Sequence, residues 1–335
     1  MVADDLFDQY RDAIEADLLH DLRKAFAKAA DDINITELIA AIEAGNEEAL
    51  AIALNLDEGL HTGVDGALMG LFFYGLLGSV VLSMKRFATS QRSRVNPSAE
   101  TSWLQNDIKR NIVEPLARRS YEAVMIAYKE LQKSDIGARQ KAEQIIRAVG
   151  LAPDQARSAA RFARALNEAL NSPDRTVKGD AITIPALTAR AIIRRHEGHL
   201  NAAQRSALKK AFAGDMKADD VGKLIIRHDR TLTAYRQSVI ARQEATRVVN
   251  VGEYLAFKQG KANRSIPRDA RRYWKTRGDE RVRHDHRMVI AMNPNGIDVG
   301  EAFKTPLGPV MHPPLEVNCR CRVVVRRPSD PASRE

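Results

Sequence analysis

Two stretches near the C-terminus determine the fold that we expect for the last part of the chain. Residues 274–286 read WKTRGDERVRHDH, and residues 316–321 read EVNCRC. Both lie within residues 261–327, which are rich in proline and glycine and end in the run Val323-Val324-Val325. β-branched runs bounded by turn formers predict short strands. We therefore expect a small α+β domain at this end of a mainly α-helical protein.

Two arginines in the first stretch have a spacing that suits a strand. If Arg281 and Arg283 lie on a strand, its two-residue period puts both guanidinium groups on one face. They could then hold a carboxylate such as Asp279 or Glu316 by bidentate hydrogen bonds, or a phosphate. Since removing one partner of a buried ion pair costs about 3–5 kcal/mol, we expect Arg283→Ala to misfold.

The histidines and cysteines of this region have the chemistry of a zinc site. Zinc favours imidazole and thiolate ligands in a tetrahedral arrangement. The candidate ligands are His286, with His284 as an alternative, together with His312, Cys319 and Cys321. In the other interpretation the two thiols are small buried hydrophobic side chains and the histidines form local hydrogen bonds. The sequence leaves both interpretations open, so zinc is a possible cofactor.

An enzymatic interpretation rests on Asp279, His284, Asp285 and His286, which could form a metal-dependent nuclease or hydrolase. Their spacing matches no established metal-ligand pattern. The sequence also has no P-loop and no Gly-x-Ser-x-Gly elbow. We therefore expect no catalytic residues and no enzymatic activity.

The N-terminal region predicts helices. Leu6, Tyr10, Ile14 and Leu18 share one helical face. The polar residues Asp31, Asp32 and Asn34 interrupt this pattern. A second periodic stretch then follows, which predicts a hairpin of short helices. A further break is expected at residues 150–154, where glycine can end one helix and proline can open the next.

These patterns divide the chain into four segments. Residues 1–95 should form the acidic helical hairpin and an apolar helix, residues 96–199 an all-helical region, and residues 200–327 the α+β domain, followed by a tail at residues 328–335. In the third segment we expect helix to about residue 257, with breaks at Gly214 and near Asp229.

The apolar helix is expected at residues 67–84, which are eighteen uncharged residues. At 1.5 Å per residue this helix would be about 27 Å long, which is borderline for crossing a membrane. It is either a buried helix of a bundle or a membrane-active segment. The candidate membrane-contacting residues are Leu71, Phe72, Phe73, Leu76 and Leu77.

Charge is distributed unevenly. The formal net charge is +9, but residues 1–60 contain four basic and fifteen acidic side chains, so the remainder carries +20. A concentrated positive charge suits a polyanion such as DNA, although a basic surface can also be merely solvated. The candidate DNA-contacting residues are Arg268, Arg271, Arg272, Lys275 and Arg277.

Composition excludes several classes of protein. Aromatic residues make up only 5% of the chain, which disfavours base stacking as the main way to bind single-stranded nucleic acid. Two cysteines are too few for a secreted disulfide framework. The acidic N-terminus does not resemble a signal peptide. We therefore expect a reducing compartment.

The C-terminal residues, in their order, resemble the Mu F-like head-morphogenesis family of phage minor head proteins over about residues 200–326. The matching residues are Trp274, Asp279, Arg281, Val282, Arg283, His286, Phe303, Gly308, Pro313 or Pro314, Glu316, Asn318, Cys319, Arg320 and Cys321. Residues 240–244, IARQE, are similar to the family's IARTE and lead to Asn250 and Tyr254. Gln243 departs from the family's threonine.

The resemblance implies a virion protein without catalytic turnover. It would be present in low copy number inside the capsid near the portal, after assembly in the host cytoplasm, and would assist procapsid assembly, DNA packaging or DNA ejection. Its partners would be the portal protein, other head proteins and double-stranded DNA, with possible contact to the host membrane. A toxin-delivery role would need a further domain, and only nine residues follow residue 326.

Overall fold

The computed structural model describes residues 2–55, 109–171, 173, 176–178, 181–183, 191, 194, 202–211 and 216–330. These residues fall into two compact units. Residues 2–23 and 238–330 belong to the first unit, and the described residues of 24–55 and 110–237 belong to the second. The predicted apolar helix at residues 67–84, its five candidate membrane-contacting residues and Gly214 lie outside the described residues.

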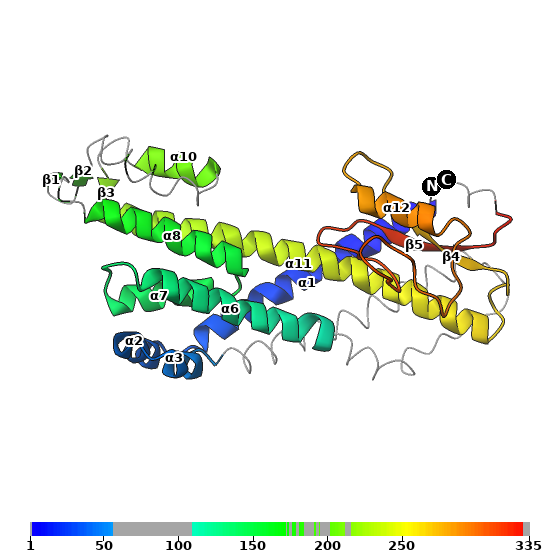
Figure 1. The fold of residues 1–335 in the computed structure, drawn as a ribbon, viewed down its shortest axis with the longest axis horizontal. Helices are drawn as coiled ribbons and strands as arrows, with labels where there is room; N and C mark the ends of the chain where they lie inside the picture. The colour runs from blue at the N-terminus through cyan, green and yellow to red at the C-terminus, as the bar shows by residue number, and fades with distance from the viewer. Residues whose placement is uncertain are drawn as a thin grey trace. The chain divides into compact units, whose positions relative to one another are not determined.

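The second unit is a group of helices with a small sheet. Its helices are α2 (Ile35–Ala44), α3 (Glu47–Leu54), α6 (Glu114–Leu131), α7 (Ala138–Ala148), α8 (Pro153–Leu170) and α10 (Ala202–Ala211), and a π-helical turn (Lys109–Val113) precedes α6. The helices α6, α7 and α8 pack against one another (Figure 1). The core on α8 consists of Phe162, Leu166 and several alanines, and the small alanine side chains let helices approach closely.

Polar caps set the helix boundaries that the sequence predicted. The side chain of Asn34 accepts hydrogen bonds from Thr36 and Glu37 at the start of α2, which satisfies amide groups that have no partner within the helix. Pro153 is the first residue of α8. Gly150 just before it has φ +87° and faces the Phe26 ring. The predicted breaks at residues 31–34 and 150–154 are therefore confirmed.

Two predictions about helix length and helix content were wrong. The first helix, α1 (Val2–Asp31), is one helix of 30 residues, with Ile14 and Leu18 buried as predicted. The segment 96–199 is not entirely helical, because β1 (Thr176–Lys178) and β2 (Ala181–Thr183) form an antiparallel sheet with β3 (Met216–Lys217).

The helix α11 (Ala218–Ala262) is drawn as one continuous helix in Figure 1. It is 45 residues long and continues through Asp229, where a break was predicted. Asp229 is buried, and its carboxylate accepts a hydrogen bond from Arg147 at 3.1 Å. This contact with Arg147 of α7 compensates the buried carboxylate. It explains why Asp229 lies inside a helix instead of ending it.

The C-terminal part of the first unit has the predicted α+β character. Strand β4 (Arg271–Lys275) pairs antiparallel with β5 (Arg322–Arg326), and Trp274 lies opposite Val323. Helix α12 (His284–Met292) packs beside β4 (Figure 1). The core between them includes Trp274, Val289 and Phe303 together with Cys319 and Cys321. The run of valines thus forms β5, as the sequence indicated.

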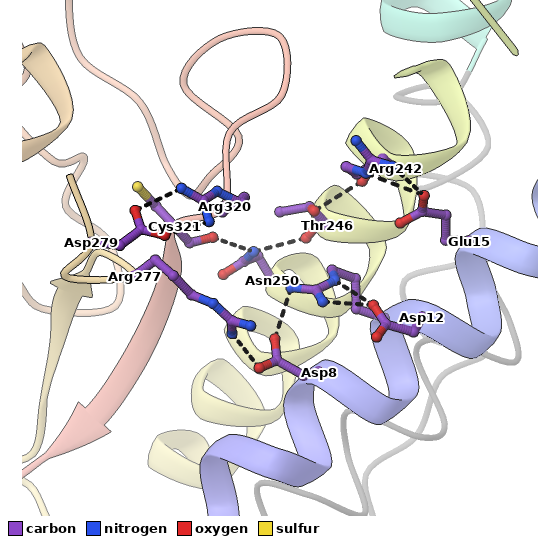
Figure 2. A network of polar contacts seen from close by, with 11 residues as sticks. Asp8, Asp12, Glu15, Arg242, Thr246, Asn250, Arg277, Asp279, Arg320 and Cys321 are labelled. Carbon is purple, nitrogen blue, oxygen red and sulfur yellow. Dashed lines mark hydrogen bonds and ion pairs between the residues drawn. The ribbon is translucent and has the colours of Figure 1, made fainter. Parts of the chain in front are cut away.

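Asn250 attaches the end of the sheet to α11. Its side-chain oxygen accepts a hydrogen bond of 2.8 Å from the backbone N–H of Val323. Its amide nitrogen donates to the carbonyl oxygen of Thr246 at 2.7 Å and to that of Cys321 at 3.5 Å (Figure 2). This fully buried side chain therefore fixes the backbone of the Cys-x-Cys segment on the helix.

No helix among the described residues combines the length and the apolar character that crossing a membrane requires.

Candidate functional site

Three residues of the predicted zinc site come together in the structure. His286 lies in the first turn of α12, and Cys319 and Cys321 lie in the segment that leads into β5. The Nδ1 atom of His286 is 3.3 Å from the Sγ atom of Cys321 and 3.7 Å from that of Cys319. All three side chains are buried, with exposed fractions of 3%, 1% and 2% for His286, Cys319 and Cys321.

The other ring nitrogen of His286 faces a carboxylate. His286 Nε2 lies 3.3 Å from Glu316 Oε2. Arg283, the residue just before α12, is 3.5 Å from the same oxygen and also donates to the carbonyl oxygen of Val317 at 2.9 Å. A proton on Nε2 shared with Glu316 leaves the lone pair of Nδ1 directed at the two sulfur atoms.

The two thiols interact directly. The hydrogen bond from Cys321 lowers the pKa of Cys319 to about 6, and the same bond and burial raise the pKa of Cys321. Of the pair, Cys319 thus carries the negative charge first. The indole group of Trp274 acts to lower the pKa of the Cys321 thiol. The predicted motif residue Trp274 therefore contributes to the core and to the polarity around the cysteines.

Arg320, between the two cysteines, pairs with Asp279, which was expected to pair with Arg281 or Arg283. It donates two hydrogen bonds to the Asp279 carboxylate, each 2.7 Å long (Figure 2). These bonds hold the pKa of Asp279 below its usual value. Arg281 and Arg283 lie in the turn before α12, so the prediction that both are on a strand was wrong. Arg283 faces Glu316, one of the two acids that the sequence offered, through a single contact of 3.5 Å and not through bidentate hydrogen bonds.

A cavity of about 280 Å³ opens beside the cysteines. His286, Cys321, Asn318 and Val282 line part of it. The remaining lining residues are arginines: Arg242, Arg277, Arg281, Arg283 and Arg320. Guanidinium groups around a cavity can bind an anion, and here carboxylates pair with all of them except that of Arg281 among the described residues.

The acidic face of α1 meets this cavity. Asp8 forms an ion pair with Arg277, and Glu15 lies 3.2 Å from Arg242 (Figure 2). Asp8 and Asp12 also hold Arg11, at 2.7 Å and 2.6 Å. Sequence reasoning missed these contacts because the paired residues are far apart in the chain. The uneven charge distribution was the only signal of them.

Arg272 was predicted to contact DNA, but it is buried. Its exposed fraction is 0%. Its guanidinium group donates to backbone carbonyl oxygens, at 2.7 Å to Met311 and 3.2 Å to Asp298, and lies over the rings of Tyr254 and Phe303. A side chain so enclosed cannot reach DNA. The prediction for Arg272 was therefore wrong.

The other four candidate DNA-contacting residues are accessible to different degrees. Arg268 and Arg277 are exposed, whereas Arg271 and Lys275 are half-buried. Arg271 donates to the carbonyl oxygen of Gly296 at 3.4 Å. Of these four residues, only Arg277 lines the arginine cavity.

The other residues that were predicted as zinc ligands or as part of an enzymatic site lie apart from this group. Among the described residues, the group that could hold a metal ion comprises His286, Cys319 and Cys321. His312 is not part of it, because its ring packs against Tyr254 and its Nδ1 lies 2.9 Å from the carbonyl oxygen of Pro313. His284 is exposed and Asp285 half-buried, and neither these residues nor Asp279 joins that group.

Comparison with known proteins identifies one region of the chain. A search of curated proteins and a search of solved structures each returned no significant match. Residues 189–324 match the family model described as Phage Mu protein F like protein, close to the range of about 200–326 over which the sequence resembles this family. The match supports a head-morphogenesis-like domain in the C-terminal region of the chain, which is similar to this family and is called the Phage Mu F-like domain below.

Proposed function

We propose that the protein is a minor head protein of a tailed bacteriophage that lies inside the capsid near the portal. It would assist procapsid assembly and the packaging or ejection of DNA, and it would act by binding rather than by catalysis. The Phage Mu F-like domain supports the role in the head. The observation that carries the DNA-binding part is the cavity lined by five arginines.

An arginine-lined cavity suits the phosphate backbone of double-stranded DNA. Each guanidinium group can donate two parallel hydrogen bonds to a phosphate. Such contacts carry no sequence information, and they gain free energy by releasing the counterions of DNA. A protein that works next to the packaged genome needs this kind of binding, because every sequence passes it.

The carboxylates of α1 would act as internal competitors of phosphate. Asp8 and Glu15 pair with Arg277 and Arg242 at positions that remain partly exposed to solvent. Exposed ion pairs contribute only about 0–1 kcal/mol each. Dense phosphate can therefore displace these carboxylates, and their presence would limit DNA binding before packaging.

The salt dependence of DNA affinity tests this proposal. We expect the logarithm of the binding constant for a random-sequence duplex to fall linearly with the logarithm of the salt concentration. Replacing Arg277 and Arg281 together by glutamine should reduce the magnitude of the slope by about 1 for each lost phosphate contact. Arg139→Gln combined with Lys133→Gln, at two exposed positions, removes the same charge and is the matched control. A flat salt dependence would contradict a phosphate-driven interaction.

The portal and other head proteins are the proposed protein partners. Residues 1–60 carry a net charge of −11, from fifteen acidic and four basic side chains, and could meet a basic surface of the portal. We expect deletion of residues 1–60 to abolish co-purification with the portal, and unchanged co-purification would remove this assignment. Residues 67–84 are proposed for contact with the host membrane, and flotation with liposomes measures that contact.

The absence of turnover is also a proposal. Incubating the protein and linear DNA with Zn²⁺ or Mg²⁺ should leave the DNA intact. Metal-dependent cleavage that is lost in His286→Ala would favour the hydrolase alternative.

A further inference from the structure

We propose that His286, Cys319 and Cys321 bind one zinc ion that fastens α12 to the segment leading into β5. This inference is independent of the DNA-binding role. It rests on three ligand atoms that lie within 4.8 Å of one another and belong to elements separated by more than thirty residues.

The spacing of the ligand atoms fits tetrahedral coordination. With Zn–S of about 2.3 Å and Zn–N of about 2.0–2.1 Å, a tetrahedral site places a sulfur and a nitrogen ligand about 3.6 Å apart. The two distances from His286 Nδ1 to the sulfur atoms, 3.3 Å and 3.7 Å, lie on either side of this value. The nitrogen atom thus already has the spacing of a zinc ligand from both sulfur atoms, and the two sulfur atoms lie within 4.8 Å of each other.

The charge balance favours zinc in a buried position. Binding replaces the two thiol protons, which pass to solvent, by one divalent ion held by two thiolates and a neutral imidazole. The resulting site has no net charge, so burial carries a smaller desolvation penalty than it would for an uncompensated ion. Thiolate and imidazole ligands also select zinc over the hard cations Mg²⁺ and Ca²⁺.

Glu316 has the position of a residue that orients a zinc-binding histidine. Zinc-bound histidines usually donate the N–H of the other ring nitrogen to a carboxylate or a carbonyl oxygen. Here His286 Nε2 is 3.3 Å from Glu316 Oε2, and Arg283 holds that same oxygen. Glu316 is thus a positioning residue that fixes both the tautomer and the plane of the ring.

The arginine cavity borders the site, because His286 and Cys321 both line it. Among the described residues no fourth histidine, cysteine or carboxylate joins the group. A water molecule in the cavity is therefore the expected fourth ligand.

Two measurements on the full-length protein test the proposal directly. Protein purified under reducing conditions without chelator should retain about one zinc per chain through gel filtration, as measured by elemental mass spectrometry. Exchange of zinc for Co²⁺ should give the visible bands of a tetrahedral cobalt site and the near-ultraviolet bands of thiolate-to-cobalt charge transfer. Folded, reduced protein that takes up neither ion would overturn the proposal. A disulfide between Cys319 and Cys321 in freshly prepared protein would do so as well.

Variants assign the ligands. Cys321→Ser should lose the thiolate-to-cobalt bands in proportion to the lost sulfur. Because that variant can fail to fold, Glu316→Gln provides a milder test, since it keeps all three ligands. We expect it to bind zinc about 10- to 100-fold more weakly, as for other residues that orient a ligand. His284→Gln, an exposed position on the same helix, should bind zinc normally. Equal zinc affinity in Glu316→Gln and the wild type would remove the positioning role.

Discussion

Arg272 donates a hydrogen bond of 2.7 Å to the carbonyl oxygen of Met311, and no part of the Arg272 side chain reaches solvent. The same guanidinium group binds carbonyl oxygens at residues 298 and 299. One buried cation therefore holds two loops that have no regular structure of their own. Burial lowers the pKa of Arg272 to about 10, so the side chain still carries its charge at neutral pH.

The first prediction concerns the stability of the Phage Mu F-like domain. Arg272→Ala should lower the free energy of unfolding by about 3–5 kcal/mol, because the carbonyl oxygens lose their donor inside the protein. Chemical denaturation measures this loss. The exposed Arg268→Ala, four residues earlier, should change stability by no more than about 0.5 kcal/mol. Equal stabilities of the two variants would contradict the structural role of Arg272.

The second prediction concerns the acidic face of α1. Asp8→Asn should raise the affinity for double-stranded DNA several-fold, because it removes the carboxylate that pairs with Arg277. Titration of a labelled duplex at fixed salt measures the change. Asp17→Asn makes the same change of charge at an exposed position of α1 and is the control. If both variants gain affinity equally, net charge rather than release of Arg277 is responsible.

Local signals made much of the fold predictable. Asn34 and Pro153 set helix starts through their own hydrogen bonds and backbone geometry, which neighbouring residues alone determine. The valines of β5 were recognisable for the same reason. Asp229 was misjudged because its partner, Arg147, lies 82 residues away in sequence. An aspartate that would end an exposed helix is tolerated where a distant arginine compensates it.

The site was predictable in composition but not in pairing. The sequence placed His286 and both cysteines in one predicted zinc site. It wrongly added His312 to that site and Arg272 to the residues that contact DNA. One signal for Arg272 was present. In a strand, residues two apart share a face, so Arg272 lies on the same face of β4 as the core residue Trp274. Charge counting gives all arginines equal weight and overlooks this placement.

The third prediction revises the expected effect of Arg283. Its ion pair with Glu316 is 3.5 Å long, and the two side chains are 47% and 38% exposed. Exposed pairs contribute about 0–1 kcal/mol, so Arg283→Ala should fold and lose no more than about 1 kcal/mol of stability. Thermal unfolding measures the loss. A variant that fails to fold would restore the sequence-based expectation that this pair is buried and essential.

Burial shifts the pKa values of two adjacent residues of α11, His228 and Asp229, in opposite directions. Burial raises the pKa of Asp229 to about 6, against the opposing effect of Arg147, and Asp229 Oδ1 has no hydrogen-bond partner among the described residues. Burial lowers the pKa of His228 to about 4. The His228 ring packs on Phe162, and its Nε2 lies 2.8 Å from Gln204 Nε2, which favours the neutral imidazole as acceptor.

The fourth prediction is that these two residues give opposite pH dependences of stability. The pKa of His228 is depressed in the folded protein, so its contribution is present above pH 6.5 and is lost as the pH falls toward 4. The pKa of Asp229 is raised, so its contribution is present below pH 3.8 and is lost as the pH rises through about 6.

In Asp229→Asn only the effect of His228 remains. The free energy of unfolding of this variant should fall by about 2–3 kcal/mol on acidification from pH 6.5 to 4, since one pKa unit corresponds to about 1.4 kcal/mol. His228→Gln should instead become more stable over the same range. Urea denaturation at several pH values measures both, and parallel pH profiles of the two variants would refute the assignment.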